Sequence, residues 1–132
     1  VAVFRDTEQF IEDIMPVVEQ YDATIIATAK GDGFQVHPLQ YFLRQFRMMP
    51  HHFTITFTCN HDVPGSVSYY WKVKNVGTIA EEKDCIRGQI VQREKTITEN
   101  TNFYGPHYVE CYVVKNGVCV ARARISVPIG NS

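Results

Sequence analysis

Apolar and polar residues alternate along much of the chain after Pro50, and a period of two predicts β-strands. Residues 53–59 alternate aromatic, aliphatic and cysteine side chains with threonines, which is typical of a half-buried strand. Further strands are predicted over residues 69–77 and 85–91, and residues 92–101 are expected to form an edge strand or a hairpin. Two long strands flank Asn116-Gly117 near the C-terminal end.

Before Pro50 the apolar residues recur at steps of three and four, which predicts helices. The first helix is expected over residues 7–30, with a kink or a second helix beginning at Pro16, because proline lacks a backbone donor. The second is expected over residues 37–49, with Pro38 in its first turn.

The register of the last hairpin follows from its loop length. A two-residue turn over 116–117 places Arg122 opposite Cys111, on the apolar side of the sheet. A three-residue loop over 115–117 instead places small apolar residues opposite Cys111 and pairs Glu110 with Arg122. We predict the three-residue loop.

Short strands that follow one another without intervening helices favour an antiparallel sandwich. The order of Cys59, Trp71 and Cys111 is similar to the Cys…Trp…Cys pattern of immunoglobulin domains. The predicted fold is mainly β, an antiparallel immunoglobulin-like β-sandwich with N-terminal helices packed on one side. A helical segment is expected over residues 1–50 and the β-sandwich over residues 51–132.

Composition limits the range of partners. The chain of 132 residues has 45% hydrophobic content, enough for one core, and its 13 basic and 14 acidic residues give a net charge of −1. No global field attracts it to nucleic acid or an anionic membrane, so any anion site is local. No apolar run approaches a membrane span and no signal peptide precedes the domain, so we expect a cytoplasmic protein. The start at Val1 suggests a piece of a longer protein.

The cysteines have no zinc-ligand spacing and are expected to be reduced core residues, so neither a metal nor a cofactor is predicted. The four are Cys59, Cys85, Cys111 and Cys119.

Basic and tyrosine side chains are predicted to converge on the outer face of the sheet. Arginine and lysine contact phosphates, and a tyrosine ring can stack on a base, so this face suits a nucleotide. The alternative is a solvated face, or one covered by the N-terminal helices. The residues are Tyr70, Lys72, Lys74, Tyr108, Tyr112, Arg122 and Arg124.

Three further groups of residues are candidate sites. Arg44 and Arg47, with two histidines after them, are explained by capping of a helix C-terminus. Arg87, next to Gly88, suits either structural pairing or ligand contact. His107 could act as acid or base, but no nucleophile or orienting carboxylate can be named beside it, so no catalytic residue is predicted.

Three ordered motifs carry a family resemblance. The stretch from Tyr70 to Gly77, the Arg87-Gly88 pair and the run from Gly105 to Tyr108 resemble the adenylyl/guanylyl and SMODS C-terminal sensor domain (AGS-C), over about residues 37–129. The resemblance implies a domain that follows a nucleotidyltransferase of the cyclic-oligonucleotide-synthase type in bacterial antiphage signalling (CBASS). It implies a role in sensing a nucleotide or an infection signal.

The chain lacks the Gly-Ser and paired-aspartate motifs of a nucleotidyltransferase, so the resemblance implies a sensor without the synthase. The helix expected over residues 7–30 would be the tail of that enzyme. The matching positions Trp71, Asn75, Arg87 and His107 become candidate ligand contacts.

Two functions are consistent with the residues and with the resemblance. The first is a regulatory sensor that binds a nucleotide or oligonucleotide and controls an attached or partner nucleotidyltransferase or effector. The alternative is a protein–protein docking domain with no small ligand. A hydrolase using His107 has the least support.

Overall fold

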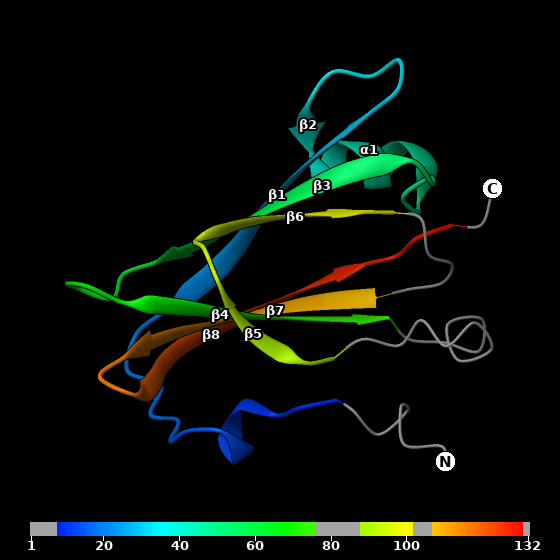
Figure 1. The fold of residues 1–132 in the computed structure, drawn as a ribbon. Helices are drawn as coiled ribbons and strands as arrows, with labels where there is room; N and C mark the ends of the chain where they lie inside the picture. The colour runs from blue at the N-terminus through cyan, green and yellow to red at the C-terminus, as the bar shows by residue number, and fades with distance from the viewer. Residues whose placement is uncertain (1–7, 76–87, 102–106, 131–132) are drawn as a thin grey trace, which may run out of the picture.

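The computed structural model describes residues 8–75, 88–101 and 107–130 and consists of two four-stranded antiparallel sheets, one packed on the other (Figure 1). The first sheet has the order β2-β1-β3-β6 and the second the order β5-β4-β7-β8. The first comprises β1 (Ala23–Gly31), β2 (His37–Pro38), β3 (Phe53–His61) and β6 (Thr96–Asn100). The second comprises β4 (Ser68–Asn75), β5 (Ile90–Arg93), β7 (His107–Lys115) and β8 (Val118–Val127).

This arrangement confirms a mainly β, antiparallel fold, while the immunoglobulin-like assignment stays a prediction. Residues on both sides of the boundary expected at position 50 build one sheet, because β1 pairs with β3 over nine residues.

The core lies between the sheets, where the inward side chains of β3 meet those of β4 and β7. Trp71 is buried there beside Cys111, and its indole N–H donates to the Glu94 carbonyl at 2.8 Å. Cys59, Cys111 and Cys119 are buried free thiols, and Cys85 lies outside the described residues. A hydrogen bond between the Cys59 and Cys111 thiols lowers the pKa of Cys59 and raises that of Cys111.

The helix predicted over residues 7–30 is wrong in the described part. The chain forms one turn of 3₁₀ helix, η2 (Ile11–Asp13), continues without regular structure, and then enters β1. Residues 23–31 also alternate around β-branched side chains, and the ladder with β3 prevails over their helical spacing. The first of the two expected N-terminal helices is therefore absent from the described residues. The helix predicted over residues 37–49 is present as α1 (Leu39–Phe46), which ends at Arg47 in the left-handed region. Its first two predicted residues, His37 and Pro38, instead form β2.

The edge strand expected within residues 92–101 is confirmed as β6, at the edge of the first sheet. The hairpin alternative is wrong, because β5 pairs with β4 while β6 pairs with β3. The strand expected over residues 85–91 falls partly outside the described residues, and β5 begins only at Ile90.

The predicted register of the last hairpin is wrong. Asn116 and Gly117 form a two-residue turn with positive φ at both residues, as a type I′ turn requires. A β-bulge then shifts the pairing by one residue, so Glu110 lies opposite Arg124 and Cys111 lies opposite Ala123. The predicted faces hold from Ala121 onward, because the bulge returns the arginines to the polar side. Before the bulge they are reversed, with Val120 in the core and Cys119 beside Tyr112 on the outer side.

In the part of the chain that the structure describes, no helix is long and apolar enough to cross a membrane.

The close pairing of β1 with β3 predicts that a side chain added at Gly31 destabilises the fold. A Cβ there would lie 2.6 Å from the buried Phe53 ring, whereas a Cβ at Gly130 would have its nearest neighbour at 3.4 Å. We expect Gly31→Ala to lower the free energy of unfolding by about 1–3 kcal/mol through overpacking, and Gly130→Ala to change it by under about 0.5 kcal/mol. Urea unfolding followed by Trp71 fluorescence measures both, and equal stability of the two variants would contradict this packing.

Candidate functional site

The outward side chains of β4, β7 and β8 meet on the outer face of the second sheet. Strand pairing sets Tyr70 opposite Tyr112 and Lys72 opposite Glu110, and it sets Arg122 opposite Tyr112 across the next ladder. Seven predicted residues thus share one surface. We call its four basic residues, Lys72, Lys74, Arg122 and Arg124, the cationic face.

The N-terminal segment (residues 8–22) crosses this surface and appears in blue at the bottom of Figure 1. Its Gln9 N–H donates to the Gly88 carbonyl at 2.9 Å, and farther along it exchanges backbone hydrogen bonds with Cys119 of β8. Ile11 is 1% exposed and packs against Tyr112. The cover predicted as one alternative for this face is therefore present, but it is mostly not helical.

Lys72 lies beneath the segment with only 2% of its side chain exposed. Its ammonium donates to a Glu8 carboxylate oxygen at 3.0 Å and to the Gln9 carbonyl at 2.9 Å. Glu110 lies 3.4 Å away, and the Phe10 ring centroid lies 4.7 Å from Nζ. A buried cation needs such partners, so Lys72 holds the N-terminal segment on the sheet while the segment is docked.

Glu8 is the acidic centre of the contact. Its carboxylate accepts hydrogen bonds from Lys72 and from the Tyr108 hydroxyl, and it also pairs with Lys74 at 3.4 Å. Partial burial raises the pKa of Glu8, but these hydrogen bonds and the two lysine charges outweigh burial and lower it to about 2. Burial, and then the bond to Glu8, raise the pKa of Tyr108.

The two arginines remain accessible. Arg122 is 38% exposed and contacts Glu12 at 2.7 Å and Glu19 at 3.2 Å. Arg124 is 56% exposed, contacts Glu110 at 3.4 Å and lies with its guanidinium carbon 3.7 Å from the Tyr108 ring centroid.

Beside them lies a cavity of about 380 Å³. Its walls include Glu8, Phe10, Glu12, Lys72, Tyr108, Tyr112, Arg122 and Arg124.

Other predicted residues are not brought to this surface. Trp71 points into the core, and buried His107 begins β7 on the face that Val109 shares. Asn75 pairs with His107 through the backbone, and Arg87 lies outside the described residues.

The sequence analysis does not identify these acidic partners, because Glu8 falls within the helix that was expected over residues 7–30. The signal that could have revealed them is the acidic series Glu8, Glu12 and Glu19 in a chain with a concentrated basic face.

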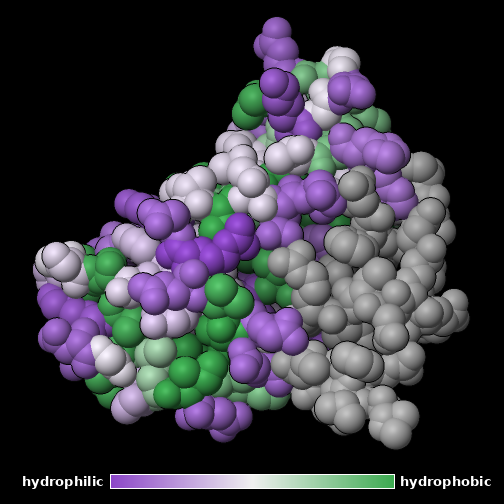
Figure 2. Space-filling model, in the orientation of Figure 1, coloured by the Kyte–Doolittle hydropathy of each residue, from purple (hydrophilic) through white to green (hydrophobic). Residues whose placement is uncertain are grey.

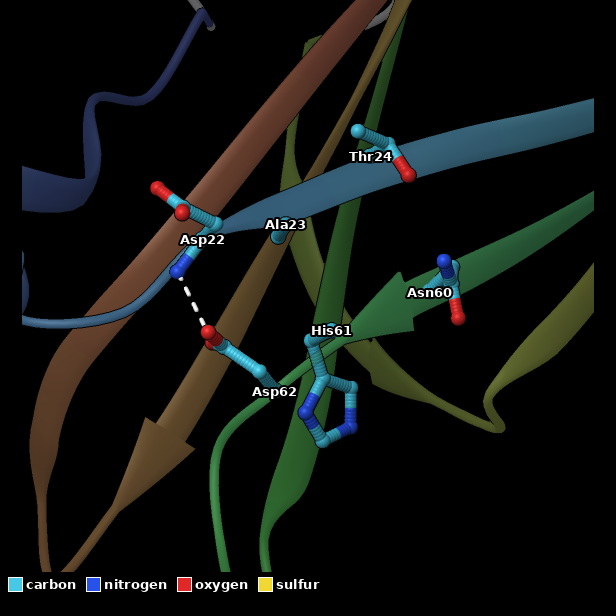
Figure 3. Close-up of a pocket in the computed structure, with 6 residues that line it drawn as sticks. All are labelled: Asp22, Ala23, Thr24, Asn60, His61 and Asp62. Atoms are coloured by element: carbon cyan, nitrogen blue, oxygen red, sulfur yellow. Dashed lines mark hydrogen bonds between the residues drawn. The ribbon is translucent and has the colours of Figure 1, made fainter.

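A second cavity, of about 200 Å³, lies where β1 begins and β3 ends (Figure 3). The Asp62 carboxylate accepts the Asp22 backbone N–H at 2.9 Å, and the other side chains in Figure 3 do not converge on a common point. Both ring nitrogens of His61 are engaged, one by the Val63 N–H at 3.0 Å and one by the Tyr69 hydroxyl at 2.8 Å. Burial lowers the pKa of His61. These contacts assign the cavity a structural role.

Among the described residues, no group of histidine, cysteine, aspartate or glutamate side chains is placed to hold a metal ion.

A family model described as the Adenylyl/Guanylyl and SMODS C-terminal sensor domain matches residues 5–130. The chain therefore belongs to this family, which confirms the resemblance found in its motifs. The description is that of a sensor domain associated with nucleotidyltransferases rather than of a catalytic domain. No curated protein and no solved structure matches the chain.

The lowered pKa of Glu8 predicts an acid-sensitive contact. Because the folded pKa lies below the unfolded value of 4.5, the Glu8 contribution is fully present above about pH 4.5 and is lost as the pH falls toward 2. We expect Glu8→Gln to reduce the free energy of unfolding at pH 7 by about 1–2 kcal/mol, after allowing for solvent screening, and the difference to shrink by pH 3.

Urea unfolding between pH 3 and 7 measures this effect. Tyr108→Phe keeps the ring beneath Arg124 but removes the hydroxyl that donates to Glu8, so its profile should lie between those of the wild type and Glu8→Gln. Parallel profiles for wild type and Glu8→Gln would rule out this role for the carboxylate.

Proposed function

We propose that this domain is a regulatory sensor that binds a nucleotide or oligonucleotide on the cationic face and controls an attached or partner nucleotidyltransferase or effector in bacterial antiphage signalling. The observation that carries the proposal is the pair of accessible arginines, Arg122 and Arg124, beside two tyrosines at one cavity. In this proposal the sensor is cytoplasmic, non-catalytic and free of cofactors, and its fold is immunoglobulin-like.

The chemistry of these side chains suits a nucleotide. A guanidinium presents a planar set of donors that can pair with two phosphate oxygens at once. The guanidinium carbon of Arg124 lies 3.7 Å from the centroid of the Tyr108 ring, and a base can stack on a guanidinium plane or on an aromatic ring. Tyr70, Tyr108 and Tyr112 would supply the aromatic part of the site.

The present partners of the arginines can be exchanged. Their ion pairs with Glu12, Glu19 and Glu110 lie in partly exposed positions, where each pair contributes about 0–1 kcal/mol. A terminal phosphate carries more charge and more acceptor oxygens than one carboxylate, and an oligonucleotide presents several phosphates at once, so either can compete for the same guanidinium groups.

The docking alternative has an observation of its own. Exposed apolar side chains lie around β2 and α1, where Figure 2 shows scattered green residues among purple ones at the upper end of the molecule. These residues are Phe34, Val36, Tyr41, Phe46 and Met48. Such a patch is typical of protein–protein contacts.

The docking role predicts self-association of the isolated chain that weakens in Phe46→Ser, because this change removes exposed apolar area. Sedimentation velocity at rising concentration measures it, and a monomer throughout the range would count against docking between copies.

The sensor role predicts selective, salt-sensitive binding. Thermal stability is measured against mono-, di- and cyclic oligonucleotides and short single-stranded DNA and RNA, because a ligand of the folded state raises its stability. For a ligand that does so, we expect Arg124→Ala to weaken binding by about tenfold, or about 1.4 kcal/mol. Added salt should weaken it further.

The matched control is Arg44→Ala, which removes an exposed arginine from α1, away from the cationic face. Its affinity should equal that of the wild type. Unchanged affinity in Arg124→Ala and Arg122→Ala would reject the site, and the absence of any thermal shift across the panel would reject nucleotide sensing by this chain.

A further inference from the structure

We propose that Glu8 and Glu12 act as an internal competitor of the anionic ligand, so that ligand binding to the cationic face and docking of the N-terminal segment exclude each other. The inference rests on the proposed function, because it concerns the regulation of that same site. It follows from the contacts, the anchoring and the charge balance of the segment.

The contacts show that the segment uses the groups that a phosphate would use. Glu8 pairs with Lys72 at 3.0 Å and with Lys74 at 3.4 Å, and Glu12 pairs with Arg122 at 2.7 Å. Three of the four basic residues of the cationic face are thus bound to carboxylates of the segment. A ligand phosphate cannot pair with these atoms while the two carboxylates remain in place.

The segment is held by a small number of apolar contacts and by backbone hydrogen bonds to Cys119. Ile11 is its fully buried hydrophobic residue and Met15 and Val17 are partly buried beside it. Three further apolar side chains remain about half exposed, those of Phe10, Ile14 and Val18. The ion pair between Glu12 and Arg122 is open to solvent. A segment with little buried apolar area can open locally while both sheets stay folded.

The charge balance shows what opening would do. With the segment docked, the four cations face Glu8, Glu12, Glu19 and Glu110. With residues 8–19 displaced, Glu110 is the carboxylate that remains among these partners, and the face becomes strongly positive. Its affinity for anions rises, because nearby opposite charges no longer neutralise it.

Two events that exclude each other are coupled in both directions. A ligand that prefers the uncovered face shifts the domain toward it. In return, a change that weakens docking of the segment raises the affinity for the ligand, by the same factor as it lowers the docking equilibrium constant. If the controlled enzyme is joined on the N-terminal side, release of residues 8–12 moves the connection between enzyme and sensor.

The test uses the double variant Glu8→Gln/Glu12→Gln with Asp13→Asn as its matched control. Asp13 is an exposed acidic residue of the same turn, and no ion pair joins it to a described residue of the sheet. The probe is inorganic tripolyphosphate, with binding measured by calorimetry. We expect the double variant to bind at least fivefold more tightly than wild type, and Asp13→Asn to change the affinity less than twofold.

Hydrogen–deuterium exchange of residues 9–21 provides a readout that does not depend on affinity. The amides should exchange faster in the double variant without ligand, and faster in the wild type with saturating tripolyphosphate. Wild type in 0.5 M salt should show the same change, because salt screens the exposed pairs. The exchange measurements on the wild type need no substitution, so they test the proposal even if the double variant does not fold.

Failure of this inference can be distinguished from failure of the proposed function. Equal affinities of the double variant and the wild type for tripolyphosphate, or unchanged exchange in the saturated wild type, would overturn the role of Glu8 and Glu12 as competitors. If the nucleotide panel still showed binding that depends on Arg124, the proposed function would stand. Absence of binding by tripolyphosphate and by every nucleotide, to wild type and double variant alike, would overturn both.

Discussion

The burial of one lysine organises much of the second sheet. Lys72 is 2% exposed, and an ammonium group at that depth is stable only with carboxylate and carbonyl partners. Glu110 supplies one partner from β7, and Glu8 and the Gln9 carbonyl supply the others from a segment more than 60 residues away in the chain. The N-terminal segment therefore lies across the sheet because the sheet presents a cation that requires it.

The β-bulge in the last hairpin determines what the segment meets. A two-residue turn alone would place Arg122 opposite Cys111, whose side chain lies in the core. The extra residue in β8 moves Arg122 opposite Tyr112 and Arg124 opposite Glu110, on the outer face. Local backbone geometry at the turn thus fixes the composition of a surface several residues away, and the assembly of the cationic face depends on it.

Local patterning was sufficient for α1, β3, β4 and β7, because each has one dominant period. It also placed Lys72, Tyr108 and Arg124 on a common face, because the register that puts arginines on the apolar side was rejected, although the loop length chosen instead was wrong. It failed for β1, where helical and strand spacing coexist and pairing with β3 decides. It failed for the hairpin register because a bulge adds a residue that no alternation reveals, and for Glu8 because its partners are distant in sequence.

The same contacts stabilise the domain and, in the proposed competition, limit its affinity for an anion. A bare cluster of four cations would be costly, because like charges repel one another at short range. Acidic residues of the chain itself relieve that repulsion, so the domain can stay folded before any ligand arrives. In the proposed mechanism, a ligand would have to exceed what Glu8 and Glu12 provide, and anions of low charge would not displace the segment. Selectivity for a highly charged signal would then follow from the contacts that stabilise the domain without a ligand.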